Sequence, residues 1–326
     1  MLKTPILVGQ LPIHNRLVLP PMASAHCPDG KVTDALVDYY EDICRGGHIG
    51  LVITEHAYIH PQGRASATQM SVASDDCIPG LTRLVDTIHR CGSKVICQIN
   101  HAGSATNPNI TGGLEAVAPS AVGHPTRGGE APREMTTEEV AQLPELFAAA
   151  ARRAKAAGYD GVEIHSAHSY LLNQFYSPLT NKRTDAYGGS LEQRIRVHLE
   201  VIAAVRAAVG EEYPIALRLG GCDYMEGGNT VADAAAACKA FAEAGVNLLD
   251  ISGGMSGFSL GERGPGWFED QSRAVKAVTD VPVILTGGVG TKAQADALLQ
   301  DGAADMIGVG RAILQDHRWA EKEMTA

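Results

Sequence analysis

Short apolar runs alternate along the chain with longer, alanine-rich segments in which apolar positions recur at helical spacing. The apolar runs predict eight strands, at residues 16–19, 49–54, 94–99, 160–165, 214–219, 246–251, 281–286 and 305–310. The clearest helical segments between them are residues 137–157, 191–209, 230–243 and 291–300. Strands that read as continuous apolar runs are buried on both faces, and their alternation with helices indicates parallel pairing.

Eight such units in succession favour a (β/α)₈ TIM barrel, an α/β fold formed here as a single domain by residues 1–326. The alternative is an open, doubly wound sheet. Its Gly-x-Gly-x-x-Gly fingerprint is missing after the first strand, where the chain reads Leu19-Pro20-Pro21-Met22. Three connections are too long for plain turns and are expected to build the site or a lid over it: residues 101–135, 166–190 and 252–268.

Composition and charge narrow the range of partners. The chain has 326 residues, 45% of them hydrophobic, and a net charge of −10 with acidic and basic residues interspersed. No basic patch points to nucleic acid. The N-terminus lacks a signal-peptide core, and no apolar run approaches the ~20 residues that cross a bilayer, so we expect a cytoplasmic protein without a membrane partner. The seven cysteines have no Cys-x-x-Cys spacing, which favours reduced thiols over a metal site.

The ends of the last two predicted strands carry glycine-rich loops. The seventh strand leads into Gly287-Gly288, and the eighth leads into Gly308-Val309-Gly310-Arg311. In barrels of this type, backbone N–H groups of these two loops hold a phosphate, and glycine lets the backbone approach it closely. A glycine pair alone also fits an ordinary tight turn. Two pairs in the expected loops, with an arginine beside one, predict a phosphate site.

Arg218 lies on the fifth predicted strand, on the same face as Ala216 and Gly220. An arginine that points into a barrel needs a negative partner, because an unpaired buried charge is very costly. Two interpretations are open. One is an internal salt bridge, for example to Glu163, and the other is contact with an electron-rich ligand.

The densest cluster of reactive side chains is the run Ile164–Tyr170, at the end of the fourth predicted strand. It places His165, His168 and Tyr170 together, which concentrates hydrogen-bond donors and a proton source at one end of the barrel. A lone histidine at a strand end is usually structural. The paired spacing with a tyrosine favours a functional role.

Residues 164–196 closely resemble the signature of the Old Yellow Enzyme family, which comprises FMN-dependent NAD(P)H:flavin oxidoreductases and ene-reductases. The likeness covers essentially the whole chain. It includes residues 15–22, 61–64 and 98–103 and the two glycine loops near the end.

The resemblance implies how an FMN would be held. Gln98 would hydrogen-bond the pyrimidine edge of the flavin, and Arg218 would lie near N1 and the C2 carbonyl. His165 would also touch the cofactor. Backbone contacts to the flavin are implied for Pro21, Met22, Ala23 and Ala57. Contacts to the phosphate are implied for Gly287, Gly288, Gly310 and Arg311.

The resemblance also implies the chemistry. His165 and His168 would bind the carbonyl oxygen of the substrate, and Tyr170 matches the proton donor of the family. NADH or NADPH would reduce FMN, and hydride would pass from the reduced flavin N5 to the β-carbon of an α,β-unsaturated carbonyl or a similar electron-poor acceptor. Two N–H donors aimed at that carbonyl would stabilise the growing enolate.

Other functions are weighed against this one. A barrel-only relative of dienoyl-CoA-reductase-type or amine-dehydrogenase-type flavoenzymes is an alternative, as is a flavin electron carrier without an alkene substrate. A Schiff-base lyase would need a lysine at the carboxyl end of a strand, and Lys94 lies at a strand start. A metal hydrolase would need closely spaced histidines directly after the first strand, where Leu19-Pro20-Pro21-Met22 provides none.

The chain also departs from some family members. Ala23 stands where some carry a flavin-tuning cysteine or threonine, and Ala25 replaces a tyrosine that lines the substrate site. The sequence stops at Ala326, before the C-terminal tail, four-cysteine cluster or second dinucleotide domain of some relatives, which leaves two interpretations open: a stand-alone barrel or one part of a longer chain. A monomer or a homodimer is expected.

Overall fold

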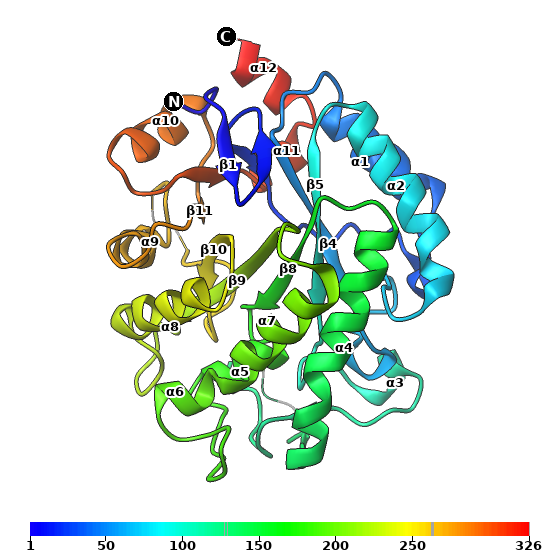
Figure 1. Cartoon of the computed structure of the whole chain (residues 1–326), viewed down its shortest axis with the longest axis vertical. Coiled ribbons are helices and arrows are strands. Elements are labelled where there is room, and N and C mark those ends of the chain that lie inside the picture. The colour runs from blue at the N-terminus through cyan, green and yellow to red at the C-terminus, as the bar shows by residue number, and fades with distance from the viewer. Residues whose placement is uncertain (127, 129, 262–263, 326) are drawn as a thin grey trace.

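The computed structural model describes residues 1–326 except 127, 129, 262–263 and 326. Within that part of the chain, eight parallel strands close into a barrel (Figure 1). The predicted (β/α)₈ fold is thereby confirmed, with strand ends that differ from the predicted ones by a few residues. In order around the barrel the strands are β3 (Leu17–Leu19), β4 (Leu51–Tyr58), β5 (Lys94–Asn100), β8 (Gly161–Ser166), β9 (Ile215–Cys222), β10 (Leu248–Gly253), β11 (Val283–Thr286) and β12 (Met306–Gly308).

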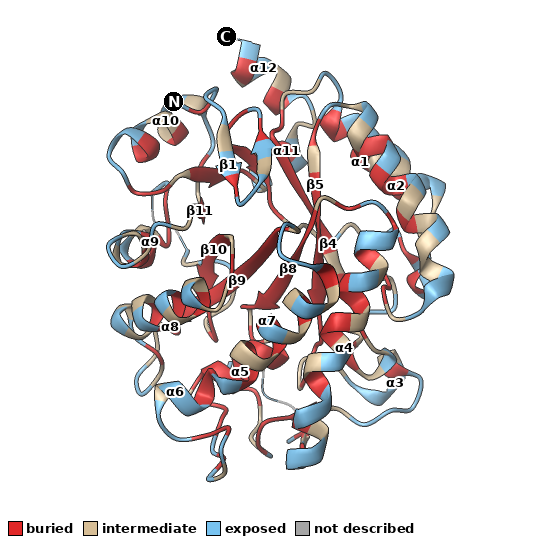
Figure 2. Ribbon diagram, viewed as in Figure 1, coloured by how far each residue is buried: buried red, intermediate tan, exposed pale blue. Residues whose placement is uncertain are grey.

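Helices surround the barrel and turn their buried faces to it (Figure 2). The predicted helix at residues 191–209 is broken, because Ile195 ends α6 (Leu191–Arg194) and precedes α7 (Arg196–Val209). Thr136 and Glu139 form the reciprocal bonds of a capping box at the start of α4 (Thr137–Ala156). Further helices are α1 (Asp34–Cys44), α2 (Ile78–Arg90), α8 (Val231–Glu243), α9 (Glu269–Lys276), α10 (Lys292–Gln300), α11 (Arg311–Gln315) and α12 (Trp319–Thr325).

The interior of the barrel begins with an apolar layer near the amino ends of the strands. Inward-facing side chains from the strands fill it, because alternate residues of a strand point to the same face. The hairpin of β1 (Ile6–Val8) and β2 (Leu11–Ile13) adds Val8 and Ile13 to this layer and so closes the amino end of the barrel. The strand residues of the layer are Val18, Leu51, Ile53, Ile96, Ala216, Leu248, Ile284 and Met306.

Strand β4 contains a one-residue bulge. Thr54 pairs with Cys97 and Ala57 with Ile99, so β4 uses three steps where β5 uses two. A bulge adds one residue to a strand and re-aims the side chains that follow it. Leu51 and Ile53 face the barrel interior, whereas Ala57 belongs to the core cluster between barrel and helices.

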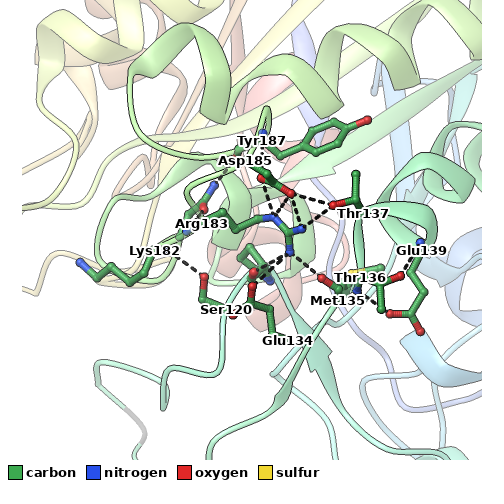
Figure 3. A network of polar contacts seen from close by, with 12 residues as sticks. Ser120, Glu134, Met135, Thr136, Thr137, Glu139, Lys182, Arg183, Asp185 and Tyr187 are labelled. Carbon is green, nitrogen blue, oxygen red and sulfur yellow. Dashed lines mark hydrogen bonds and ion pairs between the residues drawn. The ribbon is translucent and has the colours of Figure 1, made fainter.

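The long connections at the carboxyl ends of the strands are tied together by Arg183. Its guanidinium donates to the carbonyl oxygens of Pro119 (3.0 Å) and Met135 (2.6 Å) and pairs with Asp185 (Figure 3). Asp185 also accepts from the Thr137 hydroxyl. These contacts join the loop after β8 to the short elements of the loop after β5, which are α3 (Pro108–Thr111), β6 (Val117–Ala118) and β7 (Arg133–Glu134). The loop after β8 also carries α5 (Leu171–Tyr176).

None of the helices in the described ranges is long and apolar enough to span a bilayer. Among the same residues, no group of three or more histidine, cysteine or acidic side chains is placed to hold a metal ion. All seven cysteines are free thiols.

Candidate active site

A cavity of about 490 Å³ opens at the carboxyl ends of the barrel strands. Its size is in the range of small-molecule sites, and the carboxyl end is where barrel enzymes place their active sites. All but one of the residues predicted to bind the cofactor or to act in catalysis line it, although they come from six strands and the loops after them. They are Pro21, Met22, Ala23, Gln98, His165, His168, Tyr170, Arg218, Gly287, Gly288, Gly310 and Arg311.

Ala57 does not line this cavity, and its neighbour His56 does. The bulge in β4 is the cause. Without it, strict alternation from Ile53 would bring Ala57 inward; with the extra residue, His56 faces the cavity and Ala57 packs outward. Ser252 is a second lining residue that sequence reasoning missed. Ser252 could have been predicted, because Leu248, Asp250 and Ser252 are alternate residues of β10 and therefore share one face. The bulge in β4, by contrast, has no signal in the sequence.

The rings of His165, His168 and Tyr170 form one cluster after β8. The ring centroid of His165 lies 5.2 Å from that of His168 and 5.1 Å from that of Tyr170. His168 and Ser169 adopt left-handed backbone angles, with φ of 58° and 65°. Such strain in residues other than glycine often accompanies a functional turn. The His168 N–H donates to the Gly253 carbonyl, and its Nε2 lies 2.7 Å from Ser252 Oγ, which together fix the ring.

His165 is uncharged at neutral pH. Burial lowers its pKa well below the usual value, and the charges of His168, Arg218 and His56 lower it further. Only 2% of His165 is exposed, so little water reaches the ring. A neutral imidazole in such a place still offers one N–H donor, without the cost of a buried charge.

Beneath these rings lies a floor of buried polar side chains from adjacent strands. Gln98 Nε2 donates to Glu163 Oε1 at 2.7 Å. Arg218 Nε lies 3.1 Å from Asp250 Oδ2, so the salt-bridge partner is Asp250 rather than the Glu163 that we considered from the sequence. Sequence alternation does place Asp250 inward, but it leaves the choice between the two carboxylates open. The ion pair is a charge contact, because the Arg218 Nε hydrogen does not align with either Asp250 oxygen.

Both floor carboxyl groups bind protons more tightly than usual. Burial and the nearby charge of Asp250 raise the pKa of Glu163 to about 8, against the opposing effect of Arg218. Burial raises the pKa of Asp250 to about 6, again against Arg218. We therefore expect Glu163 to be largely protonated at pH 7 and to share one negative charge with Asp250 next to the arginine.

The glycine loops after β11 and β12 form the other end of the cavity. Gly287 and Gly288 have φ of 126° and 71°, backbone angles that residues other than glycine rarely adopt. A Cβ on Gly288 would lie 2.7 Å from Trp267 Nε1. The guanidinium carbon of Arg311 lies 4.3 Å above the Trp267 ring, so the cation is held in place beside the loop.

These features fit a flavin mononucleotide. Its pyrimidine edge carries both carbonyl and N–H groups, and the floor offers the Gln98 amide together with buried polar atoms that lack a partner, among them Glu163 Oε2 and Arg218 Nε. Its phosphate is best bound by backbone N–H groups that approach it closely and by a cation. The loops that contain Gly288 and Arg311 offer both. A ring system lying between the two ends would be covered by the histidine cluster.

Comparison with known proteins agrees with this description. The model of the NADH:flavin oxidoreductase / NADH oxidase family matches residues 1–325. A protein named NADH oxidase from Thermoanaerobacter brockii is 41% identical over 97% of this chain and 49% of its own length. A protein named NADPH dehydrogenase from Halalkalibacterium halodurans is 37% identical over 94% of this chain and 89% of its own length.

The fold has a close counterpart among solved structures. A 2-naphthoyl-CoA reductase in complex with 2-naphthoyl-CoA superposes with a TM-score of 0.92 at 31% identity, over 98% of this chain and 51% of that one. The chain thus spans about half the length of the first curated relatives that it matches. The match across residues 1–325, together with the relative matched over most of its length, shows that the chain belongs to the NADH:flavin oxidoreductase / NADH oxidase family.

Proposed function

We propose that the chain is an FMN-dependent NAD(P)H oxidoreductase that reduces the C=C bond of an α,β-unsaturated carbonyl or a similar electron-poor acceptor. One observation carries this proposal: His165, His168 and Tyr170 are grouped in one wall of a cavity whose floor and far loops fit a flavin. The names of the two relatives, an NADH oxidase and an NADPH dehydrogenase, support the nicotinamide donor.

The cofactor would be held at both ends. Gln98 and Arg218 would bind the pyrimidine edge of FMN, and Gly287, Gly288, Gly310 and Arg311 would bind its phosphate. FMN bound there would supply the hydride chemistry that links NAD(P)H to the β-carbon of the acceptor. A cation such as Arg218 beside N1 and the C2 carbonyl favours the reduced, negatively charged form. The backbone of Pro21, Met22 and Ala23, with the strand end that carries Ala57 and His56, would line the rest of the ring system.

The histidines would stabilise the charge that develops on the acceptor. His165 and His168 would each donate an N–H to the carbonyl oxygen, where an enolate forms as the β-carbon receives hydride. One such donor is typically worth about 3 kcal/mol of barrier. Ser252 would keep the His168 ring in position. The Tyr170 hydroxyl would then give its proton to the α-carbon.

A second candidate is a barrel that works as one part of a longer flavoenzyme, of the dienoyl-CoA-reductase or amine-dehydrogenase type. The observation in its favour is that the chain spans 49% of the NADH oxidase and 51% of the 2-naphthoyl-CoA reductase chain. In that case the barrel would bind the flavin and the acceptor, and electrons would arrive from a partner segment rather than from NAD(P)H directly.

The test is an absorbance spectrum of the purified protein, followed by anaerobic titration with NADH and with NADPH. We expect a bound flavin that at least one nicotinamide bleaches. Stopped-flow mixing of the reduced protein with 2-cyclohexen-1-one should then restore the colour faster than oxygen does. Protein that stays colourless after FMN is added would refute the proposal. A flavin that dithionite reduces but neither nicotinamide reduces would favour the second candidate.

A further inference from the structure

His56 is a third imidazole in the wall of the cavity, and the roles proposed above leave its side chain unused. It sits on the bulge of β4 and lines the same space as the histidine pair. Its ring centroid lies 6.2 Å from that of His165 and 5.1 Å from that of Tyr170. His165 therefore has an imidazole neighbour in His56 as well as in His168.

The contacts of Gln69 fix which ring nitrogen of His56 carries the proton. Gln69 is buried, its Oε1 accepts from the Ala65 N–H at 2.6 Å, and its Nε2 donates to the His56 carbonyl at 3.1 Å. These two bonds set the orientation of the amide. The same Nε2 lies 3.1 Å from His56 Nδ1, so Nδ1 accepts a hydrogen bond. Asn100 Nδ2 approaches the same atom at 3.0 Å.

A neutral imidazole that accepts at Nδ1 carries its hydrogen on Nε2. Burial, and then the charge of Arg218, lower the pKa of His56 to about 4, so the ring is neutral at pH 7. With Nδ1 occupied by the two amides, Nε2–H is the remaining polar group of the ring, and it is a donor. The positive charge of Arg218 acts on both His56 and His165, which also favours negative charge on a ligand bound between them.

We propose that His56 Nε2–H binds the acceptor, and that this site selects acceptors whose activating group carries two oxygen atoms, such as a nitro group or a carboxylate. The inference rests on the proposed function. His165 and His168 together bind one oxygen of the group. His56, whose ring lies next to that of His165, binds the second oxygen. A ketone has one oxygen and uses the pair alone, so it gains nothing from His56.

The test compares three ligands that share a cyclohexene ring: 1-nitrocyclohexene, cyclohexene-1-carboxylate and 2-cyclohexen-1-one. Their Kd values are measured by calorimetry on the oxidised, flavin-loaded protein, where no turnover occurs. His56→Phe keeps an aromatic ring without a donor. His56→Gln keeps both functions, since its Oε1 can accept from Gln69 and its Nε2 can donate. His14→Phe, which removes an exposed imidazole just after the N-terminal hairpin, is the matched control.

In His56→Phe we expect the Kd for the nitro and carboxylate ligands to rise about tenfold, and that for the ketone less than about threefold. His56→Gln should recover most of the loss, and His14→Phe should behave as wild type. Equal weakening of all three ligands, no weakening, or a His56→Gln variant that matches His56→Phe would overturn the proposal. A shifted flavin spectrum with an unchanged ratio of Kd values would also overturn it, because His56 would then serve the cofactor.

A separate measurement tests the proposed function: the reduced wild-type protein is mixed with the same three compounds and its reoxidation is followed. A protein that binds them with the expected dependence on His56 but is reoxidised by none keeps the binding role and loses the reductase function. A protein that is reoxidised by them, with no dependence of binding on His56, keeps the reductase function and loses the inference.

Discussion

At the scale of single residues, two of the imidazoles that line the cavity are uncharged at neutral pH. His165 and His56 both have lowered pKa values because they are buried near Arg218, so each presents an N–H rather than a charge. Spacing in the sequence was enough to predict that His165, His168 and Tyr170 lie together, since all three follow one strand end. His56 could not be predicted in the same way, because strand alternation points to Ala57 and only the paired strand β5 reveals the bulge.

The double substitution His165→Ala with His168→Ala should separate binding of the flavin from reduction of the acceptor. Both donors to the acceptor oxygen would be lost, while the phosphate loops stay intact. We expect the flavin to remain reducible by NAD(P)H and the reoxidation by 2-cyclohexen-1-one to slow at least about a hundredfold. Stopped-flow absorbance measures both steps, with His14→Ala as the control. Enone reduction at the wild-type rate would show that the pair is not the oxyanion site.

At the scale of elements, the cavity is lined both by strand ends and by the loops that follow them, and specific contacts hold these loops. The glycines after β11 and β12 were predictable from their place in the barrel. The cation–π contact of Arg311 with Trp267 was not, because Trp267 lies in a long loop whose path the sequence does not determine. The same applies to Arg183, whose partners are spread over three segments of the chain.

Gly288→Ala tests the phosphate loop. The new Cβ would meet Trp267 Nε1 at 2.7 Å and the Gly264 carbonyl at 2.8 Å, on a backbone with positive φ. We expect the loop to shift and FMN to bind about tenfold more weakly, measured by titrating the apoprotein and following flavin fluorescence. Gly290→Ala, on the same loop, is the control, since the nearest atom to its Cβ lies at 3.7 Å. Equal affinity in the two variants would contradict the phosphate assignment.

Asp185→Asn tests the Arg183 network through its pH dependence. Hydrogen bonds from Arg183 lower the pKa of Asp185 to about 2, below the value near 3.9 of an unfolded chain. A group with a lowered folded pKa stabilises the fold above the unfolded value, and the stabilisation is lost as pH falls from about 4 to 2.

At pH 7 the free energy of unfolding of the variant should be about 1 to 2 kcal/mol lower than that of the wild type, which is a few degrees of Tm. The loss stays this small because 30% of the Asp185 side chain is exposed to water, which weakens its interaction with Arg183. The difference between variant and wild type should shrink as the pH approaches 3. Scanning calorimetry at both pH values measures it. Glu145→Gln, which breaks the exposed pair with Arg152, should change Tm little at either pH. A Tm difference that is constant with pH would rule out the charge of Asp185 as the source.

At the scale of the whole molecule, the closed barrel brings together side chains that are up to about three hundred residues apart. The fold was predictable because eight apolar runs alternate with helical segments. Parallel strands that are buried on both faces have such continuous apolar sequences. The broken helix at Ile195 was not, since the periodicity of residues 191–209 continues through it. We retain the expectation of one domain that forms a monomer or a homodimer, which light scattering of the purified protein would decide.

Ile53→Ala tests the apolar layer that supports the site. Ile53 is fully buried inside the barrel, and its loss leaves a cavity among side chains from several strands. Substitutions of this kind cost about 2 to 5 kcal/mol, so Tm should fall by several degrees in calorimetry. Leu7→Ala, at a side chain that is 62% exposed, should have little effect. Equal Tm values for the two variants would mean that this layer contributes less than its burial indicates.

The hairpin of β1 and β2 has a kinetic consequence. Among the described residues, the hairpin closes the amino end of the barrel with Val8 and Ile13, so the cavity opens at the carboxyl ends of the strands. In the proposed function the nicotinamide and the acceptor would both use this opening, so the oxidised nicotinamide would leave before the acceptor binds. Steady-state plots at several fixed donor concentrations should accordingly give parallel lines, the signature of a ping-pong order.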